Sequence, residues 1–245
     1  MPNKKLSSLS VFFPCYNEGE NLPVILNQAL MVLPKVANKY EIIVVNDGSS
    51  DDTKNVAQKF TSQFPNIKVI SHQMNRGYGA AIRTGINKSK NEWIFFTDGD
   101  GQFDLNELEN FVMNRGNFNV VLGYRKSRAE GIKRAIFARL YKLYIDFLFR
   151  VHVKDIDCAF KLFKSEELKE LSLFSSGAFI SSEILYKLKK RHIKFKQMPV
   201  NHYPRKFGFS TGANIRVIIV GLWEPLKLYL RMKFGLKLTD TNDQA

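Results

Sequence analysis

The feature that most constrains the fold is the alternation of short apolar runs with helical patterns through the first half of the chain. Five runs have the pattern of buried strands: residues 9–16, 40–47, 67–72, 92–98 and 119–124. Helical patterns lie between them, at residues 21–33, 49–60 and 77–89. Strands that are apolar on both sides and alternate with helices are typical of a mostly parallel sheet covered by helices on both faces. The sequence therefore predicts an α/β fold.

Polar residues directly follow three of these predicted strands. Asn17 and Glu18 come after the first strand, Asp47 ends the second, and Asp98 and Asp100 follow the fourth. Ligands of such sheets bind beyond the carboxyl ends of the strands. We therefore expect these side chains to share one site.

The second half of the chain has a different character. Residues 132–153 form a helical pattern in which basic residues recur beside a broad Ile, Phe, Leu and Tyr face. Further predicted elements are a strand at 157–163, a helix at 176–190 and a strand at 194–200. A second amphipathic pattern, interrupted by Pro225, predicts a C-terminal helix at about 213–235, before a flexible tail at 236–245. We find no linker or repeat, so a single domain over residues 1–245 is predicted.

The chain is strongly basic, because it has 37 Lys and Arg residues and 23 Asp and Glu residues, which gives a net charge of +14. Such a field favours nucleic acid, anionic lipid or phosphorylated substrates as partners. A nucleic-acid-binding domain would carry motifs of the RNP, zinc-finger or helix-turn-helix type. The sequence has none of them, so no nucleic-acid partner is expected.

The sequence also indicates a compartment. Cys15 and Cys158 are too few for a disulfide framework, which favours a reducing, cytoplasmic environment. The first residues make a poor signal peptide. The best apolar run, at residues 217–223, is too short to cross a bilayer of about 30 Å.

The Asp-Gly-Asp turn after the fourth strand places Asp98 and Asp100 close together. Repulsion between two carboxylates is relieved by a cation, and Mg²⁺ or Mn²⁺ binds through one or two carboxylates together with substrate phosphates. Two alternatives exist. The turn could be a solvated acidic loop, or part of a calcium loop, although Phe103 stands at the sixth position where that loop requires glycine.

Four motifs follow one another at the strand-to-helix junctions: PCYNEGENLP, VVNDGSSDDT, NRGYGAAIRTGI and DGDGQF. Together they resemble the GT-A family 2 glycosyltransferases over residues 9–123. The segments GYRKSR and DIDCAFKLFK, with residues 181–212, resemble the polyprenyl-phosphate sugar synthases of that family, the dolichyl-phosphate mannose synthase type. The resemblance implies a Rossmann-like GT-A fold, with a nucleotide-sugar and metal half at 9–123 and an acceptor half at 124–212.

The resemblance also implies that the protein is a hexosyltransferase. It would transfer a sugar from a UDP- or GDP-linked donor to a polyprenyl phosphate, in a metal-dependent reaction that inverts the configuration at the anomeric carbon. The implied donor-binding residues are Pro14, Tyr16, Glu18, Asp47, Arg76, Gly77, Gly79 and Asp98. The implied ligands of Mg²⁺ or Mn²⁺ are Asp98, Asp100 and Gln102. The implied acceptor-phosphate residues are Arg125, Arg205 and Lys206, and the implied catalytic residues are Asp157, Arg125 and Arg205. Mannose synthases have His-Pro after this glutamine, where the chain has Phe103 and Asp104, so the sugar is left open.

Several residues have alternative structural roles. Asp47 could cap the helix that follows it. Glu183 could pair with a lysine, and so could either Asp157 or Asp155, which lies two residues away on the same predicted strand face. The histidines show no metal-ligand spacing and are predicted to be structural: His72, His152, His192 and His202.

The kind of acceptor decides which groups the chemistry needs. A phosphate monoester is largely ionised near neutral pH, so it needs positioning and cations rather than a strong base. A hydroxyl of a soluble or cell-surface glycan is the alternative acceptor, and it would need Asp157 or Asp155 as a base.

Basic, aromatic helices suit an anionic membrane surface. We therefore expect a peripheral protein at the cytoplasmic face of a membrane, where a separate membrane-protein partner is possible.

Overall fold

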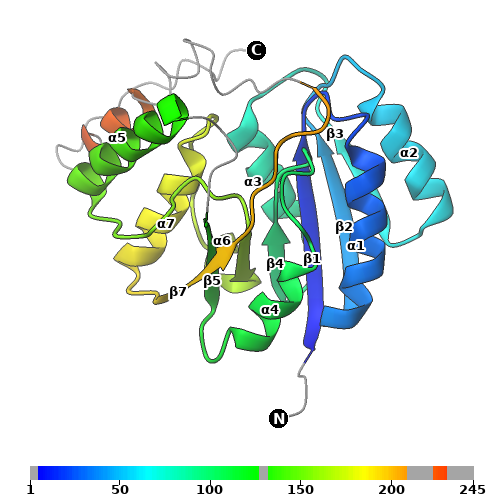
Figure 1. Ribbon diagram of the computed structural model, residues 1–245, viewed down its shortest axis with the longest axis horizontal. Coiled ribbons are helices and arrows are strands. Elements are labelled where there is room, and N and C mark those ends of the chain that lie inside the picture. Colours follow the sequence, from blue (N-terminus) through cyan, green and yellow to red (C-terminus); the bar gives the residue numbers. More distant parts are fainter. Residues whose placement is uncertain (1–4, 127–131, 209–222, 231–245) are drawn as a thin grey trace.

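The structure is a computed structural model that describes residues 5–126, 132–208 and 223–230, with the side chains of residues 132–138 outside the description. Its described strands form one seven-stranded sheet in the order β3-β2-β1-β4-β6-β5-β7 (Figure 1). The strands are β1 (Leu6–Cys15), β2 (Ala37–Asn46), β3 (Ile67–Ser71), β4 (Trp93–Phe96), β5 (Val120–Arg125), β6 (Lys161–Lys164) and β7 (Phe195–Val200). The helices are α1 (Leu22–Val36), α2 (Thr53–Gln63), α3 (Tyr78–Lys88), α4 (Glu107–Asn114), α5 (Ile132–Phe149), α6 (Ser165–Lys169) and α7 (Ile180–Lys190).

The sheet is mostly parallel. Strands β1 to β4 pair in parallel, β7 pairs in parallel with β5, and β6 runs antiparallel between β4 and β5. The carboxyl ends of β1 to β4 therefore lie along one edge, which we call the carboxyl edge. The predicted α/β architecture is confirmed.

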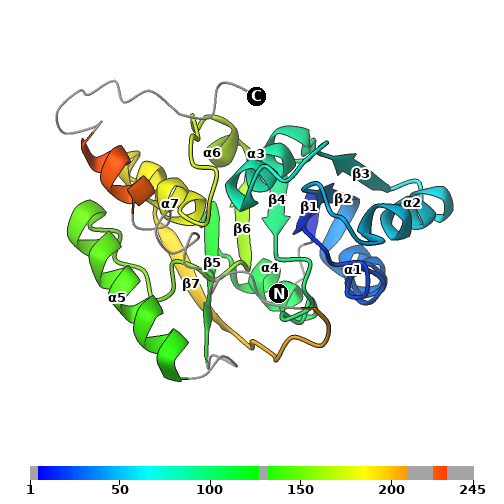
Figure 2. The same ribbon diagram turned by 90° about the horizontal axis from the view of Figure 1, so that it is seen from above.

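Helices cover both faces of the sheet, as Figure 2 shows for α3 and α6 on one side and α1 and α4 on the other. Alternation along β1 explains this arrangement, because successive strand side chains point to opposite faces. Val11 and Phe13 join the core under α1 and α4, whereas Phe12 joins the core under α3, α5 and α7. Burial on both faces matches the continuous apolar runs in the sequence.

The predicted strand at 157–163 is largely wrong, because β6 begins only at Lys161. The buried Lys161 ammonium donates to the carbonyl oxygens of Ile156 and Cys158, and these bonds fold the preceding residues into a loop. Helices α4 and α6 were not predicted.

The C-terminal helix is described at residues 223–230 alone. Pro225 lies within this described stretch and does not interrupt it. The rest of the predicted 213–235 helix and the 236–245 tail lie outside the described residues. Among the residues that are described, no helix is long and apolar enough to cross a membrane.

Candidate functional site

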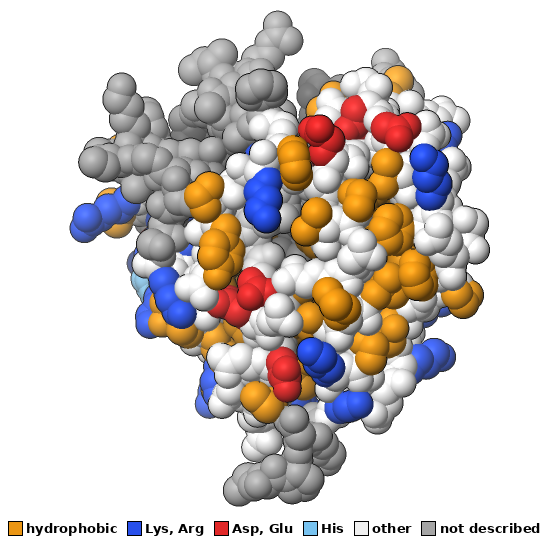
Figure 3. Space-filling view, turned by 45° about the vertical axis from the view of Figure 1, so that its right-hand side comes forward, with side chains coloured by type: hydrophobic (Ala, Val, Ile, Leu, Met, Phe, Trp, Pro, Cys, Tyr) orange, Lys and Arg blue, Asp and Glu red, His pale blue; other side chains and the backbone are white. Residues whose placement is uncertain are grey.

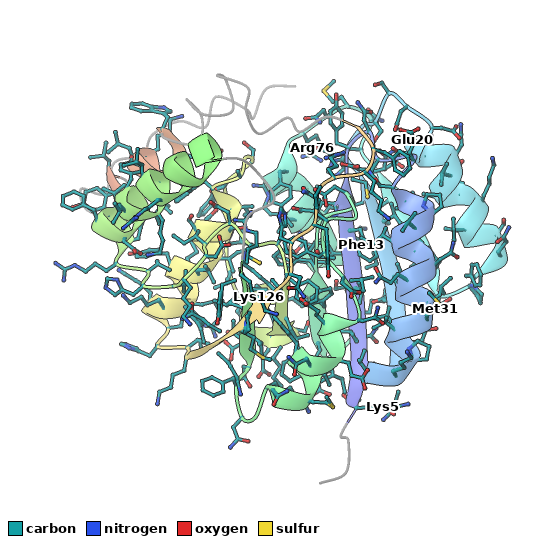
Figure 4. All side chains as sticks on the ribbon, viewed as in Figure 1. Lys5, Phe13, Glu20, Met31, Arg76 and Lys126 are labelled. Carbon is teal, nitrogen blue, oxygen red and sulfur yellow. The ribbon has the colours of Figure 1, made fainter. Side chains whose placement is uncertain are left out.

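The polar residues that follow the strands meet at the carboxyl edge, as predicted. The Asp47 N–H donates to the Cys15 carbonyl at 2.9 Å, and the Gly99 N–H donates to the Pro14 carbonyl at 3.3 Å, so the ends of β1, β2 and β4 are joined. Tyr16, just beyond β1, is 40% exposed. Figure 4 labels Glu20 and Arg76 at this end of the molecule, and Figure 3 shows acidic side chains gathered there.

Asp98 is a buried carboxylate at this edge whose pKa is strongly raised. Burial raises its pKa to about 7, and the neighbouring Asp100 charge acts in the same direction. The Tyr78 hydroxyl and the buried Lys161 oppose the rise. Its Oδ1 atom is buried and has no hydrogen-bond partner among the described residues. The site therefore has negative charge that a cation would stabilise.

The groups around Asp98 fit a hard divalent cation. Asp100 accepts the Gln102 backbone N–H at 3.1 Å, whereas the Gln102 side-chain amide donates to the Tyr203 carbonyl at 2.9 Å. The part of the chain that is described contains no group of three His, Cys, Asp or Glu residues with metal-binding geometry. Mg²⁺ and Mn²⁺ need no such group, since they use one or two carboxylates and complete their coordination with substrate phosphates and water.

Asp47 is buried at the end of β2 and organises the turn before α3. Its Oδ1 accepts the Arg76 N–H and its Oδ2 accepts the Gly77 N–H, both at 2.9 Å. The His72 Nδ1 atom lies 2.6 Å from Oδ1. The proposed cap on the following helix is therefore wrong, since it is Asp51 that accepts the Thr53 N–H at the start of α2.

Gly77 and Gly79 are required by close packing. Gly77 has a φ of 92°, a conformation that favours glycine. A Cβ atom on Gly79 would lie 2.4 Å from the Ser175 carbonyl oxygen. Their N–H groups are bonded within the protein, to Asp47 and Ser176 respectively.

Arg205 reaches the carboxyl edge from a distant part of the chain. Its Nη2 lies 2.6 Å from both carboxylate oxygens of Glu18, and its Nη1 lies 3.9 Å from Asp100 Oδ2. Burial raises the pKa of Glu18, and hydrogen bonds from Asn21 and Arg205 partly offset this rise. Arg205 is therefore at the site, where it pairs with a predicted donor residue. Lys206 is exposed beside it.

The second predicted phosphate ligand, Arg125, is held by Asp155. Its Nε and Nη2 atoms lie 2.7 and 2.8 Å from the two carboxylate oxygens, and both side chains are less than 10% exposed. This bidentate pair explains why Asp155 is present and leaves Asp157 as the candidate carboxylate. Asp157 lies near the site, because its charge contributes to the raised pKa of Tyr78.

Lys161 is a site residue that the sequence analysis missed. It is 1% exposed, and burial lowers its pKa while nearby groups that include Asp157 and Asp98 raise it. Its cation therefore lies beneath the acidic turn. The signal in the sequence was a single lysine inside the apolar run AFKLF.

Comparison with known proteins adds to this geometry. The model of the family described as "Glycosyl transferase family 2" matches residues 10–172. The chain belongs to glycosyl transferase family 2. It is 32% identical over 215 residues to a dolichyl-phosphate beta-glucosyltransferase of Homo sapiens, which covers 79% of this chain and 66% of that protein. It is 30% identical over 210 residues to one of Trichomonas vaginalis, which covers 78% and 64% respectively. The matched region thus spans just under two thirds of these relatives.

The fold is shared with a solved structure of another glycosyl-transferring enzyme. Glucosyl-3-phosphoglycerate synthase from Mycobacterium tuberculosis, in complex with Mn²⁺, UDP and glucosyl-3-phosphoglycerate, superimposes with a TM-score of 0.71 at 16% identity. The superposition covers 96% of this chain and 82% of that one. The predicted GT-A fold is therefore confirmed.

Within this family 2 fold, Glu183 has a structural environment. It is 0% exposed and pairs with Lys187. Its carboxylate also accepts the N–H groups of Phe174 and Ser175. The alternative of a lysine partner is confirmed, and the contacts with residues 174 and 175 were not foreseen.

Proposed function

We propose that this family 2 protein transfers a glucosyl group from a nucleotide diphosphate, with UDP-glucose as the first candidate, to the phosphate of a polyprenyl lipid. The observation that carries the proposal is the juxtaposition of the Asp98–Asp100 turn with Arg205 at one sheet edge. The donor diphosphate and the acceptor phosphate are both anions. The two carboxylates would hold a cation on the diphosphate, and the arginine would bind the acceptor phosphate. The names of the relatives support the glucosyl group and the lipid phosphate acceptor.

In the proposed reaction, an acceptor phosphate oxygen attacks the anomeric carbon of the sugar. The bond from that carbon to the donor diphosphate breaks, and the nucleoside diphosphate leaves with the electron pair. A single displacement inverts the configuration at the anomeric carbon. No proton must be removed, because the phosphate is already ionised.

The residues of the chain position these groups. Asp98, Asp100 and Gln102 would hold Mg²⁺ or Mn²⁺, which when bound neutralises charge on the leaving diphosphate. The remaining donor residues stay as predicted, namely Pro14, Tyr16, Glu18, Asp47, Arg76, Gly77 and Gly79. Arg205 would orient the acceptor phosphate together with Lys206 and Arg125, and Asp157 would lie beside the reacting centre.

Helix α5 supports contact with a membrane surface. Its inner face is buried at Ile145 and Phe149, whereas Leu140, Leu143 and Phe147 are 56%, 56% and 84% exposed. A helix that only covered a sheet would expose polar residues on its outer face. We propose that this apolar stripe enters the lipid interface, which brings the site to a membrane-borne acceptor.

The activity can be tested with a panel of UDP-glucose, UDP-galactose and GDP-mannose, each with a short polyprenyl phosphate and Mn²⁺. We expect glucosyl phosphopolyprenol from UDP-glucose, and no product when the unphosphorylated polyprenol replaces the phosphate. Transfer to a soluble glycan hydroxyl, with none to the lipid phosphate, would instead establish the alternative acceptor.

Membrane contact is tested separately with vesicles. Replacing the outward pair Leu143 and Phe147 by serine should reduce sedimentation with anionic vesicles while transfer to a detergent-solubilised acceptor is retained. Replacing the exposed Met31 on α1, which is 64% exposed, is the matched control. Unchanged vesicle binding by the α5 variant would contradict the proposal.

A further inference from the structure

Residues 174–177, which we call the 174–177 segment, pack tightly against the start of α3. The Ser176 carbonyl accepts the Gly79 N–H at 2.7 Å. Added Cβ atoms on Gly77 and Gly79 would lie 2.5 and 2.4 Å from carbonyl oxygens of this segment. The Arg83 guanidinium also donates to the carbonyl oxygens of Phe174 and Ser175 in this segment. A displacement of the segment must therefore displace the start of α3.

The start of α3 carries predicted donor-site residues. The N–H groups of Arg76 and Gly77 bind Asp47, and the Tyr78 hydroxyl is hydrogen-bonded to Asp98. The same turn thus links the predicted nucleotide residue after β2 to the acidic turn after β4. Its position determines the geometry of the donor side.

Two buried or half-buried carboxylates hold the 174–177 segment from its other side. Glu183 of α7 accepts the Phe174 N–H at 3.0 Å, the Ser175 N–H at 2.9 Å and the Ser175 hydroxyl at 2.6 Å. These bonds take the place of the backbone pairing that a strand or helix would supply.

The second carboxylate comes from the C-terminal helix at residues 223–230. Glu224 Oε1 accepts the Ser176 N–H and hydroxyl, both at 3.2 Å, and the Gly177 N–H at 3.3 Å. Its Oε2 is buried and has no hydrogen-bond partner among the described residues. The hydrogen bonds of Glu224 in the described structure therefore all go to the 174–177 segment.

We propose that Glu224 is a positioning residue for donor binding: through Ser176 and Gly177 it holds the start of α3 in the geometry that accepts the nucleotide. Glu183 is the inner anchor of the same segment. The inference rests on the proposed function, because its readout is nucleotide binding. The proposal also gives the C-terminal helix a role in donor binding, although the 174–177 segment lies between this helix and the donor site.

The test uses the full chain with UDP and Mn²⁺ as the probe, measured by calorimetry. Glu224→Ala should weaken UDP binding about fivefold, the size expected for a residue that acts on a site without touching the ligand. The KM for UDP-glucose should rise by the same factor with little change in kcat. Glu224→Gln should bind like the wild type, because an amide oxygen still accepts the same donors. Glu224→Asp, which keeps the charge but is shorter, should resemble Glu224→Ala.

Hydrogen exchange provides a readout that does not depend on activity. In Glu224→Ala, amide exchange should become faster in peptides that cover residues 76–82 and 174–179, and should be unchanged in α1. The matched control is Glu170→Ala, which removes an exposed carboxylate paired with Arg191. The control should leave UDP binding and exchange at the start of α3 unchanged.

The outcomes separate the two proposals. If the wild type binds UDP and Glu224→Ala binds it equally, with unchanged exchange at residues 76–82, the positioning role is wrong. If Glu224→Gln is as weak as Glu224→Ala, the charge rather than the geometry matters, and the inference is also overturned. If the wild type binds neither UDP nor GDP, the proposed function itself is wrong.

Discussion

Replacing Arg205 separates two roles that the structure assigns to one side chain. Arg205 pairs with Glu18 at 2.6 Å, and we propose that it also contacts the acceptor phosphate. Both partners of the pair are largely buried, with side chains 18% and 9% exposed. Arg205→Ala should therefore affect stability through the ion pair and transfer through the phosphate.

The two effects have different sizes. Loss of a charge-assisted hydrogen bond lowers the free energy of unfolding by about 1.5–3 kcal/mol. In the variant, water can enter and solvate the Glu18 carboxylate, which reduces the loss to about 1–2 kcal/mol. For a chain of this length that corresponds to a Tm lower by about 3–6 °C. Loss of the phosphate contact should reduce transfer about 100-fold, which is about 2.7 kcal/mol of transition-state stabilisation.

Glu18→Gln is the informative partner variant. It weakens the same ion pair but leaves the guanidinium in place, so a similar decrease in Tm is expected. Its KM for the polyprenyl phosphate should stay near the wild-type value, whereas Arg205→Ala should raise that KM or lower kcat. Arg205→Lys should recover only part of the activity, because an ammonium lacks the forked geometry of a guanidinium.

Steady-state kinetics with varied acceptor, together with thermal unfolding, provides the measurement. The reasoning is refuted if Glu18→Gln and Arg205→Ala lose transfer equally with unchanged acceptor KM, since the ion pair alone would then explain the effect. Asp157→Asn should be milder than Arg205→Ala. If Asp157→Asn is inactive and Arg205→Ala nearly normal, the acceptor is a hydroxyl.

Three further predictions concern the metal, the nucleotide and stability. Asp100→Ala should abolish Mn²⁺ binding in calorimetry while changing the Tm by less than about 2 °C, and full transfer in EDTA would contradict the metal assignment. Asp47→Ala should weaken UDP binding about tenfold and change kcat less, because Asp47 holds the turn before α3; equal UDP affinity would show that neither Asp47 nor the turn it holds contributes to nucleotide binding. Burial raises the pKa of Glu41, but hydrogen bonds from Lys68, Ser10 and the Lys90 N–H outweigh burial and lower it below the ordinary value. The ionised Glu41 therefore adds to the free energy of unfolding at pH values above its pKa in the unfolded chain, about 4.3. This contribution is lost as the pH falls through its lower pKa in the folded protein. The difference in unfolding free energy between wild type and Glu41→Gln should therefore shrink on acidification, and a pH-independent difference would show that the charge of Glu41 is not responsible.

The sequence by itself determined the α/β architecture and where the candidate site lies on it. Both are encoded locally, since strand and helix periods can be read in short windows and the Asp98–Asp100 turn directly follows its strand. The family motifs are also local, so the resemblance could be recognised before any contact was known. The division into donor and acceptor halves stays a prediction.

Only the tertiary structure decided which side chains are partners. Glu18 and Arg205 are 187 residues apart, and Arg125 and Asp155 are 30 apart, distances over which periodicity carries no information. The same holds for the Glu224 carboxylate and the 174–177 segment, which come together because α3, α7 and the C-terminal helix pack on one face. A buried charge or N–H must find a partner wherever the fold brings one, and that choice depends on packing rather than on neighbours in the sequence.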